Sequence, residues 1–225
     1  MVSAECRPLI NVFTRLPVAG GTKTRLIPVL GEQGAASLSR AMLEWTLETL
    51  SDNWPGEICI VVAPETDGVT SSLGFNGNAQ TIQRGDNLGD RMLNAIADDT
   101  YTTSECPRAI IGADVPHVPA STLQDAACRL HSGDNVIGPA IDGGFYFIGM
   151  LNASRDLFEN VIWGADDVYR RVMDNADRIG MTFYQLPELR DIDTPTDLQL
   201  VAREYPPLAE FLLQAGVNVA RVRNV

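Results

Sequence analysis

Lysine is almost absent from this sequence: Lys23 is the only lysine among the 17 basic residues of a 225-residue chain. Acidic residues outnumber basic ones by 29 to 17, which gives a formal net charge of −12. A surface with this charge repels the phosphates of nucleic acids and anionic membrane headgroups. We therefore expect neither nucleic acid nor a membrane among the partners of the protein.

Long apolar runs are missing as well. Residues 1–10 include Glu5 and Arg7, and no stretch has the length and apolarity of a membrane-spanning helix. We therefore expect a cytoplasmic protein without a secretory signal.

The cysteines show no pattern of a metal site or a redox motif. They are far apart, they form no CxxC pair, and no histidine stands at the spacing of a zinc ligand. Since disulfides are rare in the cytoplasm, we expect reduced cysteines that serve in packing. The four are Cys6, Cys59, Cys106 and Cys128.

Apolar runs of strand length alternate with patterns of helical spacing along the chain. No linker, repeat or low-complexity stretch interrupts this order, which predicts one three-layer α/β domain with a largely parallel sheet. The expected strands are 8–13, 57–63, 79–83, 108–112, 135–140, 145–150 and 181–186. The expected helices are 32–50, 88–97, one from residue 121, 166–179, and one that Thr194 and Asp197 cap.

Chemically informative residues follow several of these strands. Ligands of parallel sheets bind at the carboxyl ends of the strands. The loop 14–25 follows the first strand, Asp114 follows the central one, and residues 191–193 follow a late one. The sequence therefore predicts that these three segments converge on one site.

The loop 14–25 contains three cations and no acidic residue, although acidic residues dominate elsewhere. Glycines between a strand and a helix let backbone N–H groups and cations approach a polyphosphate. The pattern is neither a Walker A motif nor a dinucleotide-binding fingerprint, and a flexible solvated turn is the alternative. The predicted phosphate-binding residues are Gly20, Gly21, Thr22, Lys23 and Arg25.

Two aspartates suit a divalent metal ion. Asp114 stands at the expected carboxyl edge of the sheet, and Asp193 precedes a threonine that already serves as the better helix cap. Mg²⁺ prefers such oxygen ligands, and it bridges phosphate oxygens. The alternative is that both aspartates only cap helices or turns.

Two further segments are candidates for substrate contacts. Residues 83–89 combine an amide, a cation and turn glycines before a helix, which suits a nucleotide base or ribose or else a plain loop. Residues 142–144 lie between two strands and form either a tight hairpin or an acceptor site with Asp142 as a general base. The predicted nucleotide contacts are Gln83, Gly85, Asn87 and Gly89. The predicted acceptor contacts are Asp142, Gly143, Gly144 and Trp163, although a tryptophan that only packs is the simpler reading of Trp163.

Together these segments resemble the GT-A-like superfamily of nucleotide-diphospho-sugar transferases, and most closely its bacterial radical-SAM/selenodomain-associated transferases. The match runs from the first strand to the helix after Asp193. It consists of Phe13, Pro17, 20–26 (GGTKTRL), 85–92 (GDNLGDRM), 111–116 (IGADVP), 138–146 (GPAIDGGFY), Trp163, Gly164 and 191–198 (DIDTPTDL).

The resemblance implies a Rossmann-like GT-A fold with a mostly parallel mixed sheet, and an NTP or nucleotide-sugar substrate. By position, Lys23 and Arg25 would hold phosphates, Asp114 and Asp193 would hold Mg²⁺ or Mn²⁺, and residues 142–144 would hold a small-molecule acceptor. We predict that Lys23, Asp114 and Asp142 are the catalytic residues.

Three functions fit this pattern. The first is a glycosyltransferase-like enzyme that uses a nucleotide sugar. The second is a nucleotidyltransferase that releases pyrophosphate, similar to the 2-phospholactate guanylyltransferase type, because a single aspartate rather than an Asp-x-Asp pair ends the central strand. The third is a non-catalytic nucleotide-sensing or partner-binding module, since Arg15 and Ala165 stand where the family usually has lysine and threonine.

The expected transferase domain comprises residues 1–204. Residues 205–225 carry apolar side chains at helical spacing, among them Leu208, Phe211 and Leu212. We expect this tail to pack on the domain or to form an interface, for example in a homodimer.

Overall fold

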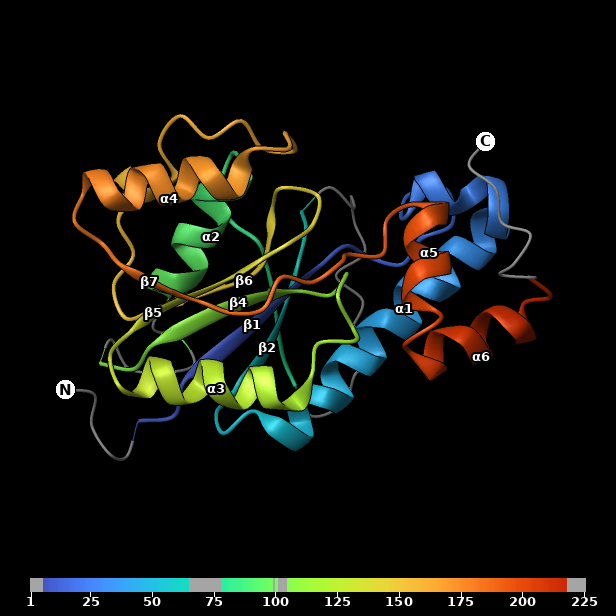
Figure 1. Cartoon of the computed structure of the whole chain (residues 1–225), viewed down its shortest axis with the longest axis horizontal. Coiled ribbons are helices and arrows are strands. Elements are labelled where there is room, and N and C mark those ends of the chain that lie inside the picture. The colour runs from blue at the N-terminus through green and yellow to red at the C-terminus, as the bar shows by residue number, and fades with distance from the viewer. Residues whose placement is uncertain (1–5, 65–77, 99, 101–104, 218–225) are drawn as a thin grey trace.

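The computed structural model describes residues 6–64, 78–98, 100 and 105–217. The strands of this part are β1 (Leu9–Thr14), β2 (Ile58–Val62), β3 (Ala79–Ile82), β4 (Arg108–Gly112), β5 (Asn135–Pro139), β6 (Phe145–Met150) and β7 (Phe183–Gln185). They form one sheet in the order β3-β2-β1-β4-β6-β5-β7 (Figure 1). β6 is antiparallel to β4 and β5, and the other pairs are parallel, which confirms a mostly parallel mixed sheet.

Helices cover both faces of this sheet. Side chains alternate between the faces along each strand, so strands that are apolar throughout need a helix layer on each face. Ile111 and Phe147 pack with α1 (Ile27–Asn53) and α3 (Ala120–His131). Their neighbours Ile110 and Ile148 pack on the other face with α2 (Leu88–Ala97) and α4 (Val168–Arg178). Figure 1 shows these helix pairs on opposite sides of the sheet, which confirms the three-layer α/β domain.

The first long helix, α1, begins before the position that its apolar pattern predicts. Gly31 interrupts it with non-helical dihedral angles, φ 70° and ψ 168°. Pro28 precedes this kink in the first turn, where proline is tolerated. Residues 27–30 thus form an extra turn, and the predicted start at residue 32 coincides with the regular part of the helix.

The last helices lie beside α1, away from the main sheet (Figure 1). α5 (Pro195–Val201) begins with the predicted capping box of Thr194 and Asp197. α6 (Pro206–Gln214) buries Leu208 and Leu212 in a cluster with Leu38 and Met42 of α1. The division of the chain after residue 204 stays a prediction, and residues 218–225 of the predicted tail lie outside the described residues.

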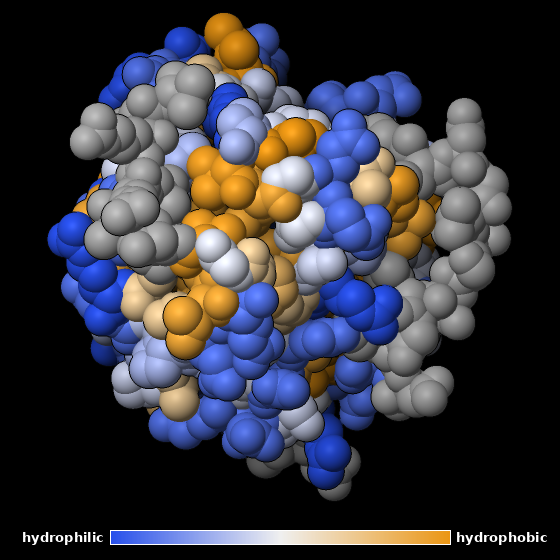
Figure 2. All heavy atoms as spheres, turned by 90° about the vertical axis from the view of Figure 1, so that its right-hand side faces the viewer, coloured by the Kyte–Doolittle hydropathy of each residue, from blue (hydrophilic) through white to orange (hydrophobic). Residues whose placement is uncertain are grey.

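Some apolar side chains of this region remain at the surface. Leu213 of α6 is 77% exposed. Figure 2 views the molecule from the side on which α5 and α6 lie in Figure 1, and apolar residues gather there between hydrophilic ones. A homodimer stays a prediction. None of the described helices has both the length and the apolarity to cross a membrane.

A disulfide between Cys6 and Cys106 corrects the expectation that all four cysteines are reduced. Their Cα atoms are 5.4 Å apart, although 100 residues separate them in sequence. Each cysteine comes shortly before a strand, and the parallel register of β1 and β4 pairs Leu9 with Arg108. Strand adjacency therefore brings the two cysteines together, which a search for local cysteine motifs does not detect.

This disulfide is expected to stabilise the fold, because it closes a long loop in the unfolded chain. The Cys6→Ser variant, or reduction of the wild type, should lower the free energy of unfolding in urea by roughly 2 to 4 kcal/mol. Cys128→Ser is the control, since Cys128 is free and exposed. Equal unfolding free energies with and without reductant would contradict this assignment.

Candidate active site

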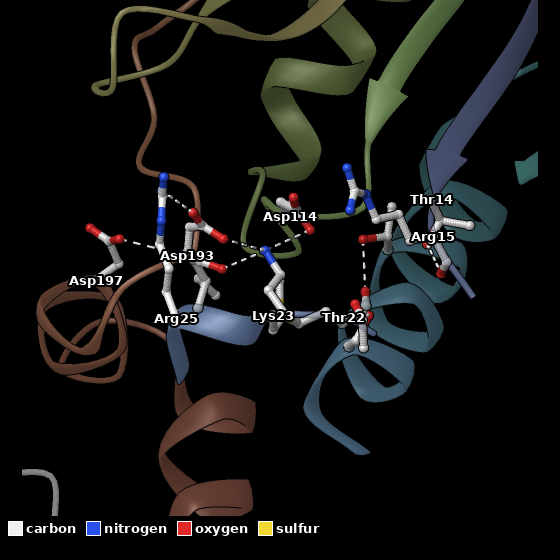
Figure 3. A network of polar contacts seen from close by, with 12 residues as sticks. Thr14, Arg15, Thr22, Lys23, Arg25, Asp114, Asp193 and Asp197 are labelled. Atoms are coloured by element: carbon white, nitrogen blue, oxygen red, sulfur yellow. Dashed lines mark hydrogen bonds and ion pairs between the residues drawn. The ribbon is translucent and has the colours of Figure 1, made fainter. Parts of the chain in front are cut away.

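Three chain segments meet at the carboxyl ends of β1 and β4 (Figure 3). They are the loop after β1 with its short 3-10 helix η1 (Thr24–Leu26), residues 113–116 after β4, and residues 191–193. The backbone N–H of Ile192 donates to the carbonyl oxygen of Asp114 at 2.9 Å. The predicted convergence is present because adjacent parallel strands end at the same edge of the sheet.

The ammonium group of Lys23 lies at the centre of this arrangement. Its Nζ is 2.8 Å from Asp114 Oδ1 and 3.7 Å from Asp193 Oδ1, and it donates to the carbonyl oxygen of Ile192 at 2.6 Å. Figure 3 shows Lys23 pointing between the two aspartates. The side chain of Lys23 is only 5% exposed, so these oxygens replace most of its water.

The backbone of the loop directs Lys23 toward the aspartates. Lys23 adopts the left-handed conformation, with φ 46° and ψ 44°, which costs a residue with a side chain about 1 kcal/mol. Buried residues hold the loop on both sides of it: Leu26 lies in the core, and the hydroxyl of Thr22 bonds to that of Ser39 at 3.2 Å. Thr22 therefore positions the loop.

The outer part of the same loop faces solvent. Gly20 and Gly21 are exposed, and Gly20 has φ 77°. Arg15 is exposed beside Thr14 at the end of β1 (Figure 3). The role of the two glycines in phosphate binding stays a prediction.

Asp193 lies between two cations. Arg25 Nη1 is 2.6 Å from Asp193 Oδ2, and the Arg25 side chain is 72% exposed. The backbone N–H of Asp193 donates to Asp197, which also accepts from Thr194 and pairs with Arg190. The capping box of α5 thus fixes the segment that carries Asp193.

The residues around Lys23 offer oxygen donor atoms of the kind that a divalent metal ion such as Mg²⁺ prefers. Two carboxylates, Asp114 and Asp193, and the carbonyl of Ile192 already surround one positive charge with oxygen atoms. Mg²⁺ commonly takes one or two carboxylates and completes its shell with water and phosphate oxygens. Among the described residues no group of three or more His, Cys, Asp or Glu side chains gathers to hold a metal, so phosphate and water would supply the remaining ligands.

The turn between β5 and β6 has the predicted tight hairpin form. Asp142 is exposed, and its carboxylate accepts from the N–H of Gly144 at 2.8 Å. Gly143 has φ 89°, and its carbonyl accepts from the N–H of Tyr169 at 2.8 Å. A Cβ on Gly143 would lie 1.9 Å from the carbonyl oxygen of Asp166, so only glycine fits there.

Asp191 is a further carboxylate of the site, beside Lys23 and Asp142, and the sequence pattern predicts no separate role for it. Ala140 and Leu189 form an isolated parallel bridge, which brings the segment that carries Asp191 alongside the turn that carries Asp142. Burial and, next, the charge of Asp142 raise the pKa of Asp191 to about 6. Its spacing from Asp193 was the available signal, because alternate residues of an extended segment point the same way.

Residues 83–89 form the approach to α2. Gln83 is buried, and its amide donates to the carbonyl of Val61 at 3.1 Å. The side chain of Asn87 caps α2 by accepting from the N–H of Asp90 at 3.0 Å. Gly85 has φ 139°, and a Cβ there would lie 2.7 Å from the Cβ of Asp90. These contacts are structural, and nucleotide binding by this segment stays a prediction.

Trp163 packs against the start of α2 and is partly buried. Its ring lies 6.1 Å from that of Phe158, and a Cβ on Gly89 would be 2.7 Å from Trp163 Cζ2. Gly89 thus makes room for the indole ring. The contact of Trp163 with an acceptor stays a prediction.

The family model DUF2064, described as an uncharacterized protein conserved in bacteria, matches residues 46–165, more than half of the chain. The chain belongs to this family. A crystal structure from Desulfovibrio desulfuricans G20, described as a nucleotide-diphospho-sugar transferase, is 30% identical to this DUF2064 protein. The similarity covers 93% of this chain and 98% of that one, with a TM-score of 0.81.

More distant structures share the fold of this DUF2064 protein. The inositol-1-phosphate CTP transferase of T. maritima is 14% identical, with a TM-score of 0.53 and coverage of 94% of this chain and 98% of that one. A CMP:2-keto-3-deoxy-manno-octonic acid synthetase complexed with CTP is 10% identical, with a TM-score of 0.54 and coverage of 88% and 99%. These likenesses confirm the GT-A-like fold. No curated protein matches the sequence.

Gly143→Ala should destabilise this DUF2064 protein more than Gly164→Ala does. Both glycines have a left-handed φ, 89° and 88°, but a Cβ meets no atom within 4 Å at Gly164. Gly164→Ala should therefore cost only ~1 kcal/mol, whereas the clash at Gly143 should raise the cost to roughly 3 kcal/mol or more. Urea unfolding measures both costs, and equal values would contradict the close approach to Asp166.

Proposed function

We propose that this DUF2064 protein is a divalent-metal-dependent transferase that takes its transferred group from a nucleotide. The convergence of Lys23 and Arg25 with Asp114 and Asp193 supports the proposal. A metal–nucleotide complex needs cations for its phosphates and carboxylates for its metal ion. Here one loop supplies two cations, and two other segments supply one carboxylate each.

The phosphate end of the substrate would bind at the loop after β1. Arg25 offers an exposed guanidinium, and the N–H groups of the glycine segment can accompany it. Asp114 and Asp193 would hold Mg²⁺ or Mn²⁺. When bound, such an ion neutralises charge that develops on phosphate oxygens during transfer.

The acceptor would bind at the hairpin turn between β5 and β6. Asp142 is exposed there, and its carboxylate can accept the hydrogen of an acceptor hydroxyl. In nucleotidyl transfer, the hydroxyl oxygen of the acceptor forms a bond to the α-phosphorus of the NTP. The bond between the α-phosphorus and the oxygen that bridges it to the β-phosphorus breaks. Asp142 takes the proton, and pyrophosphate leaves.

Nucleotidyl transfer is the version that the end of β4 favours. Asp114 is followed by Val115 and Pro116, both buried, so this strand ends with one carboxylate and not with a pair. Glycosyl transfer from a nucleotide sugar is the second candidate. The description of the 30% identical relative as a nucleotide-diphospho-sugar transferase favours it.

Nucleotide binding should depend on Asp114. In the presence of Mg²⁺ or Mn²⁺, at least one member of a panel of NTPs and nucleotide sugars should raise the melting temperature of the wild type. Asp114→Asn should remove this rise because it removes a metal ligand. Asp134→Asn should retain the rise in melting temperature. Asp134 directly precedes β5, so it lies at the amino ends of the parallel strands, opposite to the site.

The product distinguishes the versions of the proposal. Release of pyrophosphate from an NTP identifies nucleotidyl transfer, and release of a nucleoside diphosphate identifies glycosyl transfer. Binding without turnover across an acceptor screen would favour the nucleotide-sensing module instead. No melting shift with any nucleotide would contradict the proposal.

A further inference from the structure

We propose that the Lys23 ammonium and the divalent ion occupy the same place in turn, so that Lys23 leaves the two aspartates when a metal–nucleotide complex binds. This inference rests on the proposed function and adds an exchange step to it. It assigns Lys23 two successive partners: the carboxylates in the free protein and the phosphates in the complex.

The contacts of Lys23 resemble those of a bound cation. An ammonium group has three donors, and Lys23 donates to the Ile192 carbonyl at 2.6 Å. Its Nζ also pairs with Asp114 Oδ1 at 2.8 Å and with Asp193 Oδ1 at 3.7 Å. With 5% of its side chain exposed, it has few contacts to solvent. Together with Arg25, which pairs with Asp193, the ammonium already balances the charge of the two carboxylates that would hold the metal.

The two positive charges exclude each other at this place. Mg²⁺ binds carboxylate oxygens at about 2.0 to 2.1 Å, whereas Lys23 Nζ is 2.8 Å from Asp114 Oδ1. A metal ion at these Oδ1 atoms would lie within a few ångströms of the ammonium, and at such separations an ammonium strongly repels a divalent ion. A metal ion held by both aspartates therefore requires the ammonium to move.

Only the side chain of Lys23 has to move. Thr22 and Leu26 anchor the loop in the core on both sides of Lys23. The lysine side chain itself has a flexible four-carbon stem, so its ammonium can move while the backbone stays in place. Phosphate oxygens that arrive with the metal offer the released ammonium a new anionic partner. The metal alone should therefore bind weakly, and metal and nucleotide should bind cooperatively.

Removal of the ammonium should strengthen metal binding in the absence of nucleotide. Titration of Mn²⁺ monitored by electron paramagnetic resonance should give an affinity for Lys23→Met at least tenfold above that of the wild type. Arg25→Met is the matched control, because Arg25 also pairs with Asp193 but is 72% exposed. We expect a gain of less than threefold for it, and equal gains for the two variants would overturn the exchange.

The lone lysine allows a direct measurement of its own release in the wild type. Acetylation of Lys23, followed by mass spectrometry with the N-terminal amine as internal reference, should accelerate at least fivefold when Mn²⁺ saturates the protein. Addition of the best-binding nucleotide should slow it again. An acetylation rate that Mn²⁺ leaves unchanged, while Mn²⁺ binds and Asp114→Asn abolishes that binding, would overturn the exchange and leave the proposed function standing. Absence of Mn²⁺ binding to the wild type and to Lys23→Met, with or without nucleotide, would overturn both.

Discussion

The ion-pair cluster of Lys23 with Asp114 and Asp193 is the interaction on which the site depends. A buried ammonium is costly unless carboxylates or carbonyls replace its water. Its partners are far away in sequence, so β1 and β4 must lie side by side and residues 191–193 must return to their carboxyl ends. The strand order and the capping box of α5 meet these requirements. The fold thus assembles one cation site from three distant segments.

Local sequence signals predict much of this structure. Strand lengths, the α2 pattern and the capping box depend on neighbouring residues, and the structure reproduces them closely. Convergence of the three segments is also predictable, because it follows from the ends of parallel strands. By contrast, the Cys6–Cys106 disulfide depends on strand order and register, and so does the bridge that brings the Asp191 segment beside the turn of Asp142. The hydrogen bond from Lys23 to the Ile192 carbonyl is not predictable either, because a backbone carbonyl has no sequence signature.

The positions outside the cluster show how structural and functional roles overlap. Gly143 has to be glycine because of the backbone of Asp166, and Gly89 makes room for Trp163. Such constraints explain these residues without a ligand, whereas the two aspartates beside a lysine also have the donor chemistry of a metal and phosphate site. Membership of DUF2064 and the GT-A-like fold are compatible with nucleotidyl and with glycosyl transfer, so the chemistry of the cluster carries the functional proposal.

A crystal structure with Mn²⁺ and a bound nucleotide tests the central claim most directly, because the anomalous signal locates the metal independently of any assay. We predict an anomalous peak between Asp114 and Asp193, with Lys23 Nζ displaced onto a phosphate oxygen. A nucleotide bound elsewhere, with Lys23 still held by the two aspartates, would contradict the account.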